Sequence, residues 1–290
     1  MIYDPKPTKY PFPEDTSAHY IKLKKNDGAV FDSSYPYIDK TPSFLFRQKL
    51  TRILLYLVVF PVARIRLGLR IRGKKNLKLH KDELKNGVVS CSNHVHFWDY
   101  IAIMCAVKPR KPYVLTWPYN IRGENKKLIR LVGGIPIPEN DPHAAAVLNR
   151  SVYELMEENG WVHVYSEGSM WEYYCPIRPF KDGTAYIACK SCRPILPMAF
   201  SYRRPGLIRR KIFRQTALLT LRIGEPLYKN ETLPRNEQKA DLTKRSRDAV
   251  CLLAGIDPEK NIYPPLYDDS RRIDYYEEKT EADFCLAEGR

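Results

Sequence analysis

The chain has 290 residues, of which 44% are hydrophobic, so it is long enough and apolar enough to bury the core of one α/β domain. Its 48 basic and 33 acidic side chains leave a formal charge of +15, which indicates an anionic partner such as nucleic acid, a lipid surface or a phosphorylated substrate. The seven cysteines are an odd number spread through apolar stretches, which argues against a disulfide framework and favours reduced thiols in a cytosolic protein.

The first 42 residues are rich in tyrosine, proline, aspartate and lysine and show no clear periodicity, so we expect an extended arm. The first six residues contain no apolar core of a signal peptide. The longest apolar run, residues 53–63, is shorter than the roughly 20 residues of a membrane-spanning helix, and Pro61 lies inside it. We therefore expect no independent transmembrane helix.

Residues 43–72 are dominated by apolar side chains, with arginine and lysine on both sides. This composition predicts a helix, or a bent helix pair, that lies in a membrane interface with its basic groups among the lipid headgroups. The alternative is a buried core helix whose ends carry arginines. We favour the membrane-interface segment because so many basic residues border a single apolar stretch.

Strand and helix patterns alternate from residue 73 to residue 257. Strands are predicted at residues 87–92, 113–117, 135–137, 161–165, 194–200 and 217–223. Helices are predicted at residues 98–107, 125–132, 144–158, 184–192 and 238–254. This alternation indicates one α/β domain, with a mixed, mostly parallel sheet flanked by helices. Residues 258–290 are polar and rich in tyrosine, and we expect them to form a surface tail.

The most informative segment contains His94 and Asp99, which are five residues apart. An odd spacing points two side chains to opposite faces of one strand, and on one helix they would be about 140° apart. A strand that ends near Asn93 and a helix that begins near Trp98 would instead fold the chain back and bring the two together. His94 then lies at the carboxyl edge of the sheet, where α/β proteins place their sites. We expect Asp99 to accept a hydrogen bond from one ring nitrogen, which leaves the other as a base.

No serine nucleophile in a Gly-x-Ser-x-Gly elbow accompanies this histidine. We therefore predict general-base chemistry, in which His94 takes the proton of an acceptor hydroxyl and the alkoxide attacks a thioester. A metal site is one alternative, since His94 and His96 resemble half of a His-x-His-x-Asp-His ligand set, but Trp98 stands where that set has its aspartate. A structural histidine at a strand end is the other. We expect no metal and no cofactor.

Four sequence blocks occur in the order found in a known family. Asn93-His94-x-x-x-x-Asp99 resembles the first motif of the 1-acylglycerol-3-phosphate acyltransferases, within the glycerolipid acyltransferase superfamily. Counterparts of the second, third and fourth motifs are residues 133–138, 165–169 and 194–198, and the likeness covers roughly residues 75–230. The resemblance implies an α/β acyltransferase with an N-terminal helical segment that embeds in the membrane. It also implies His94 and Asp99 as the catalytic pair.

The resemblance implies further residues that bind the substrates. These are Asn93 in the first motif and Glu167, Gly168 and Ser169 in the third. Two departures concern the acceptor phosphate. The second motif usually ends in an arginine, where this chain has Glu139, and the third usually continues with an arginine, where Met170 and Trp171 follow. The cations that bind the phosphate must then come from other positions.

Lysines upstream of the second motif are the best candidates for that role, because the family places a lysine there. They are Lys126 and Lys127. Arg130, Arg178 and Lys181 are the next candidates. The other interpretation of each is a solvated surface charge.

Residues 202–214 form a dense basic and apolar patch. Nucleic-acid contact is the obvious rival interpretation, but no zinc-finger, RNA-recognition or helix-turn-helix signature accompanies the patch, so we expect no nucleic-acid partner. We favour a surface that faces the membrane or an acyl carrier. The Cys-x-x-Cys pair Cys189 and Cys192 lacks the second pair of a zinc ribbon, and the end of a helix is favoured over a redox site.

The predicted function is transfer of a fatty acyl group from acyl carrier protein or coenzyme A to the hydroxyl of lysophosphatidic acid, which gives phosphatidic acid for phospholipid synthesis. The expected location is the cytoplasmic face of the cell membrane, with peripheral or monotopic attachment to anionic lipids. The alternatives are transfer to another lysolipid or a glycolipid, and a non-catalytic basic lipid-binding protein.

Overall fold

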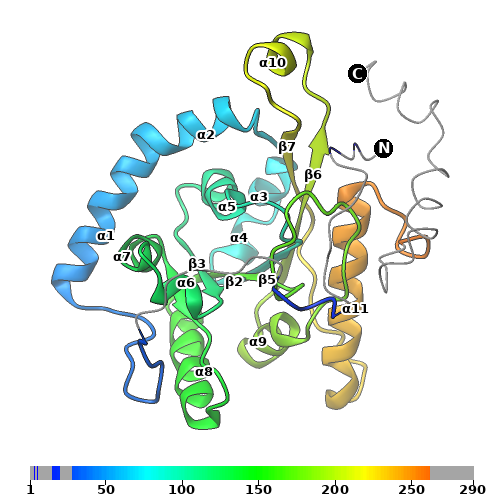
Figure 1. Cartoon of the computed structure of the whole chain (residues 1–290). Coiled ribbons are helices and arrows are strands. Elements are labelled where there is room, and N and C mark those ends of the chain that lie inside the picture. Colours follow the sequence, from blue (N-terminus) through cyan, green and yellow to red (C-terminus); the bar gives the residue numbers. More distant parts are fainter. Residues whose placement is uncertain (1–2, 4, 6–14, 20–27, 262–290) are drawn as a thin grey trace.

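The computed structural model describes the chain except for residues 1–2, 4, 6–14, 20–27 and 262–290 (Figure 1). Its centre is a seven-stranded sheet in the order β1-β7-β6-β2-β5-β3-β4. The strands are β1 (Arg70–Arg72), β2 (Val88–Ser92), β3 (Pro112–Thr116), β4 (Gly134–Pro136), β5 (Trp161–Tyr165), β6 (Ile195–Arg203) and β7 (Leu218–Ile223). All neighbours run parallel except β6 and β7. The predicted mixed, mostly parallel sheet is confirmed.

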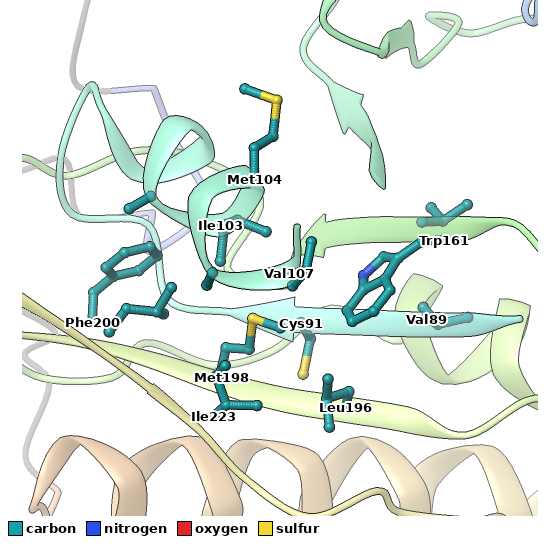
Figure 2. Close-up of a cluster of buried hydrophobic side chains, with 14 of the residues drawn as sticks. Val89, Cys91, Ile103, Met104, Val107, Trp161, Leu196, Met198, Phe200 and Ile223 are labelled. Atoms are coloured by element: carbon teal, nitrogen blue, oxygen red, sulfur yellow. The ribbon is translucent and has the colours of Figure 1, made fainter. Parts of the chain in front are cut away.

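Helices cover both faces of this sheet. α8 (Pro142–Glu157), α9 (Gly183–Ser191) and α11 (Arg235–Ala254) contact one another in that order. Figure 2 shows α5 (Asp99–Val107) on one side of the central strands, with Ile103 and Val107, and α11 on the other side. β2 is buried along its whole length because helices cover both faces of the sheet, although two of its five residues are serines.

The N-terminal helical segment is a 25-residue rod built from three pieces. They are α1 (Pro42–Leu54), the wide π-helical turn η1 (Leu55–Val59) and α2 (Phe60–Arg66). Pro61 has no N–H to bond the preceding turn, and a locally widened turn is one way in which a helix accommodates that loss. Leu55 and Phe60 are buried against the domain, whereas most other apolar side chains of the rod are exposed. Among the described residues, no helix is both long and apolar enough to cross a membrane.

Every helix and strand predicted from residue 87 onward is present, with ends shifted by at most three residues. Short elements were not predicted, because three to six residues carry little periodicity. These are β1, α3 (Lys74–Leu79), α4 (Lys81–Leu84), α6 (Tyr119–Arg122) and α10 (Leu207–Lys211). The edge strands β1 and β4 have three residues each. Most of the predicted N-terminal arm before residue 28, and the predicted tail from residue 262, lie outside the described residues.

Candidate active site

His94 and Asp99 face each other across the turn that joins β2 to α5. β2 ends at Ser92 and α5 begins at Asp99, so the chain folds back between them as the spacing predicted. The Nδ1 atom of His94 donates a hydrogen bond of 3.1 Å to Asp99 Oδ2. Asp99 is fully buried, and the same oxygen accepts the backbone N–H groups of Val95 (2.8 Å) and His96 (2.9 Å). This contact places the proton of neutral His94 on Nδ1 and leaves Nε2 for a substrate.

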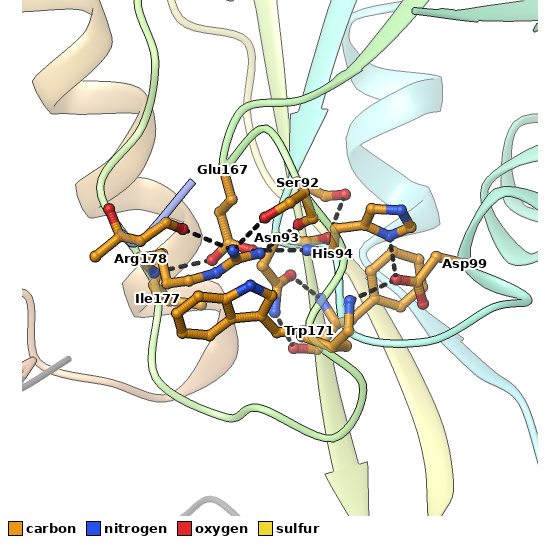
Figure 3. Close-up of polar contacts among 12 residues, drawn as sticks. Ser92, Asn93, His94, Asp99, Glu167, Trp171, Ile177 and Arg178 are labelled. Atoms are coloured by element: carbon orange, nitrogen blue, oxygen red, sulfur yellow. Dashed lines mark hydrogen bonds and ion pairs between the residues drawn. The ribbon is translucent and has the colours of Figure 1, made fainter. Parts of the chain in front are cut away.

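Glu167 is a buried brace behind His94 (Figure 3). It follows β5, and its Oε2 atom accepts the backbone N–H of His94 and the Nη2 atom of Arg178, both at 2.9 Å. Its Oε1 atom accepts the backbone N–H of Arg178, also at 2.9 Å. Both carboxylate oxygens are thus engaged within the protein. Any effect of Glu167 on an acceptor therefore passes through the position of His94.

Asn93 ties the end of β2 to the neighbouring strand β6. Its side-chain Nδ2 donates to the carbonyl of Phe200 (3.0 Å), and its Oδ1 accepts the Phe200 N–H (2.8 Å). The carbonyl of His94 accepts the backbone N–H of Trp171 at 3.0 Å. The residues on both sides of the His94 side chain are therefore fixed by hydrogen bonds to distant parts of the chain.

A chain of buried side chains lies beneath this loop and centres on His163, which is fully buried. Trp161 Nε1 donates to Ser90 Oγ (2.7 Å), which lies 2.9 Å from His163 Nδ1. Ser92 Oγ donates to the carbonyl of Asn93 (2.9 Å) and lies 3.2 Å from His163 Nε2. Since the Ser92 proton is directed at Asn93, His163 must donate from Nε2 and accept at Nδ1. The chain of bonds ends one residue before His94.

The sequence analysis did not identify His163 as part of the site. It lies inside the apolar run predicted as strand 161–165. The available signal was the pattern of polar residues on two strands: Ser90 and Ser92 alternate on β2, and Ser90 and His163 are register partners. Strand pairing is not visible in one sequence, so this signal required the fold.

Burial sets the protonation of His94 and Asp99. Burial first, and then the charge of Arg178, lower the pKa of His94 to about 3, although Glu167 acts in the opposite direction. Burial also raises the pKa of Asp99 to about 7, against the lowering effects of His96 and of backbone N–H groups. The ring of Tyr165 stacks on His94, with centroids 3.7 Å apart. His94 is therefore neutral at physiological pH, the form that a general base requires.

Two arginines predicted to bind phosphate are engaged within the protein. Arg178 is fully buried and donates to Glu167 and to Ser169 Oγ (2.7 Å). Arg130 donates to three backbone carbonyl groups. They belong to Pro36, Tyr37 and Gly134. The guanidinium of each arginine thus holds segments of this chain together.

The predicted lysines lie in two different places. Lys126 and Lys127 form the first turn of α7 (Lys126–Leu131), and both are exposed. Lys181 follows the third motif, and its side chain crosses Gly168, which has a φ of +83°. A Cβ at position 168 would lie 2.9 Å from Lys181 Cε, so glycine both permits the left-handed turn and leaves room for the lysine.

Among the described residues, no three or more histidine, cysteine, aspartate or glutamate side chains form a group that could hold a metal ion. His96, the second histidine of the His-x-His pair, accepts the backbone N–H of Trp98 at Nδ1 (3.0 Å). This contact gives His96 a part in the turn that precedes α5.

A short described stretch of the N-terminal arm, residues 15–19, reaches the site. The carbonyl of Thr16 accepts Arg178 Nη1 at 2.8 Å, and the carbonyl of Ala18 accepts the indole N–H of Trp171 at 3.0 Å. Composition indicated only an extended arm and carried no signal that it packs beside the third motif.

Residues 68–201 match the family model described as Acyltransferase. No curated protein matches the sequence. The solved structures that match include the 1-acyl-sn-glycerophosphate (LPA) acyltransferase PlsC from Thermotoga maritima. The two chains share 16% identity with a TM-score of 0.47, and the match covers 75% of this chain and 85% of that one.

Proposed function

This chain belongs to the acyltransferase family over residues 68–201, and from that premise we propose that it transfers a fatty acyl group to lysophosphatidic acid. The donor is a thioester of acyl carrier protein or coenzyme A, and the product is phosphatidic acid. The observation that carries the proposal is the contact between His94 and a fully buried Asp99, set at the carboxyl edge of a mostly parallel sheet.

The reaction follows from the free Nε2 atom of His94. Nε2 takes the proton of the acceptor hydroxyl as the oxygen attacks the thioester carbonyl. The tetrahedral intermediate collapses, the C–S bond breaks, and the thiolate takes up the proton from the imidazolium. Asp99 holds Nδ1–H throughout and stabilises the transient positive charge on the ring. No acyl-enzyme is required, so the absence of a serine elbow in the sequence fits this route.

The acceptor is the finer part of the proposal. Lysophosphatidic acid carries a phosphomonoester with nearly two negative charges, which needs cationic partners. A formal charge of +15 supports such an acceptor, although attraction to a membrane accounts for the same excess. Glu139 in place of the usual arginine leaves another lysolipid or a glycolipid as the alternative acceptor.

The proposal includes attachment to the cytoplasmic face of an anionic membrane. Two elements expose large apolar side chains, which we call the apolar face. On the helical rod they are Leu45, Phe46, Leu50, Ile53, Leu54, Tyr56, Leu57, Val58, Val62 and Ile65, and around α10 they are Leu207, Ile208, Ile212 and Phe213. Arg209 donates to the carbonyl of Ile65 at 2.9 Å, so α10 is joined to the end of α2. Basic residues flank both elements, which suits an anionic lipid surface.

The test is mass spectrometry of the products made by the purified protein. The protein is given mixed lysolipids with acyl carrier protein and coenzyme A thioesters, and His94→Ala serves as the control. We expect phosphatidic acid from lysophosphatidic acid with the wild type alone. Acylation of a different lysolipid or glycolipid would change the assigned acceptor but leave the proposed reaction unchanged. Products that form equally with His94→Ala would refute the mechanism.

A further inference from the structure

The two positions that lack the family's phosphate-binding arginines make contacts of another kind. Glu139 accepts a hydrogen bond of 2.7 Å from Arg122 Nη1, so α6 supplies a guanidinium at this position. Trp171, in the second departure, is fully buried beneath the guanidinium of Arg178, 4.3 Å from the ring centroid, and donates to Ala18. Glu139 is therefore paired with a cation, and Trp171 holds the backbone at residue 18.

Stacked rings lead from the first of these positions to the arm. Arg122 lies 5.1 Å from the ring centroid of Tyr119, Tyr119 stacks on Trp117 at 4.5 Å, and Trp117 stacks on His19 at 3.7 Å. We call these four residues the edge stack. The edge stack begins directly after β3, at the same carboxyl edge of the sheet that presents His94 after β2. It therefore lies where a substrate of His94 would bind.

Basic groups surround the His19 end of the edge stack. Burial is the main reason that the pKa of His19 falls to about 4, and the charges of Lys181 and Arg178 lower it further. Arg178 is engaged with Glu167, whereas Lys181 is exposed. The carboxylate of Asp15, on the same arm, also feels the charge of Lys181, but its Oδ1 atom already accepts two hydrogen bonds from Ser17. The cations Lys181 and Arg178 thus lie near the His19 imidazole, and Arg178 also contacts the same short stretch of chain through the carbonyl of Thr16.

We propose that residues 15–19 complete the acceptor site, and that His19 with Lys181 binds the acceptor phosphate in place of the two missing arginines. This inference rests on the proposed function, because it requires an acceptor that carries a phosphomonoester. The edge stack fixes the plane of the imidazole, and Arg178 and Trp171 hold the backbone of residues 16 and 18, so His19 is in position before the substrate arrives. A bound phosphate raises the pKa of His19, because the charged imidazolium then gains an opposite charge as neighbour.

The rival site for the phosphate is the pair Lys126 and Lys127. They lie on the exposed first turn of α7, and the sequence resemblance favoured them. The double substitution Lys126→Ala/Lys127→Ala therefore belongs in the same experiment.

The experiment compares His19→Phe with the matched control His143→Phe in the full-length protein. Phenylalanine keeps a ring against Trp117 but removes both imidazole nitrogens, and His143 is an exposed residue at the start of α8. KM and kcat are measured with lysophosphatidic acid and with a monoacylglycerol of the same chain, which lacks the phosphate. His19→Phe should raise KM for lysophosphatidic acid roughly tenfold. KM for monoacylglycerol and kcat should change by less than about twofold, and His19→Arg should recover most of the loss.

Three results would overturn this assignment. KM for lysophosphatidic acid could stay unchanged in His19→Phe, or KM could rise equally for both acceptors, which indicates a purely structural arm. The third is a tenfold rise for the Lys126→Ala/Lys127→Ala protein with none for His19→Phe, which moves the phosphate to α7.

A binding measurement separates the site from the proposed function. If the wild type acylates neither acceptor, the proposed function fails, and the site is tested by NMR titration of the His19 imidazole. The pKa of His19 is measured with and without sn-glycerol 3-phosphate. A higher pKa in the presence of this ligand supports the site, and an unchanged pKa overturns it.

Discussion

The turn that joins β2 to α5 and the apolar face are built on opposite principles. Around His94, hydrogen bonds with Glu167, Trp171 and Phe200 fix the backbone, and the partner Asp99 has no exposed surface. On the apolar face, Leu57, Ile65 and Ile212 are 70–72% exposed. The function proposed for the first region depends on individual atoms, whereas that proposed for the second depends on composition and area. Substitutions should therefore act sharply on the loop and gradually on the face.

The largest expected effect is on the base itself. His94→Ala should lower kcat/KM by about 10²- to 10⁴-fold while the melting temperature stays close to that of the wild type. Asp99→Asn should be nearly as damaging, because the amide cannot accept all of the hydrogen bonds that Oδ2 accepts. His96→Ala should be milder. Near-normal turnover in a folded His94→Ala protein would place the chemistry elsewhere.

The next effect concerns Glu167, which accepts hydrogen bonds from the His94 backbone and from Arg178. Glu167→Gln leaves the Arg178 charge buried without its partner, which costs about 3–5 kcal/mol in the free energy of unfolding. The control is the double variant Glu167→Met/Arg178→Met, in which neither charge remains. We expect it to unfold at a higher urea concentration than either single variant. If the double variant were less stable than both Glu167→Gln and Arg178→Met, the pair would stabilise the fold by more than the neutralisation of its two charges.

Acid should lower the free energy of unfolding, because His163 is buried beneath the site in its neutral form. Burial lowers the pKa of His163 to about 3, whereas the unfolded chain protonates near the ordinary value of about 6.5. The unfolded state thus binds more protons between these values, and stability falls as the pH falls through this window, by about 1.4 kcal/mol per pH unit for one such residue. The free energy of unfolding is measured with urea at pH 6, 5 and 4. For His163→Gln, the change in this free energy per pH unit should be smaller than in the wild type by that amount. An identical slope would mean that His163 is not held neutral.

The smallest effects belong to the apolar face. Leu57→Ser and Ile208→Ser should each weaken binding to anionic vesicles by several-fold to tenfold, since one side chain contributes only part of roughly 1.5–3 kcal/mol. Leu252→Ser, 66% exposed on α11, is the matched control and should bind as the wild type does. Vesicle sedimentation at low and high salt gives the measurement, and high salt should weaken all variants. Loss of binding in the control as well would show that the apolar face has no special role.

Deletion of residues 1–72 is a poor substitute for these point changes. The deletion removes β1, which pairs with β7, along with Leu55 and Phe60, which are part of the hydrophobic core. A truncated protein would lose vesicle binding and sheet structure together.

The sequence predicted those parts of the site that are local in the chain. His94 and Asp99 are five residues apart, and the change from strand to helix between them is visible as a change of periodicity. The contacts that brace the loop join residues far apart, such as His94 with Glu167 and Asn93 with Phe200, and one sequence contains no record of such pairs. His19 is the extreme case, because it lies in an arm without periodicity.

The helical rod shows the same limit at the level of fold. Apolar composition located it, and the proline inside the run suggested a bend. In the structure the helix is continuous through one widened turn, it curves along its length in Figure 1, and Leu55 and Phe60 anchor it to the domain at the start and just after the end of that turn. Composition located this helical segment, but its path depends on how its buried side chains pack against the domain, which one sequence does not reveal.

The two short edges of the described sheet have a consequence for handling the protein. An exposed strand edge presents unpaired backbone groups that can recruit another chain and start aggregation. Here one edge is β1, with exposed arginines at both ends, and the other is β4, which ends in Pro136 and so lacks a backbone donor there. Neither edge offers more than three residues for pairing. Concentrated protein should therefore resist strand-mediated aggregation, and any association at high concentration should come from the apolar face, where detergent can prevent it.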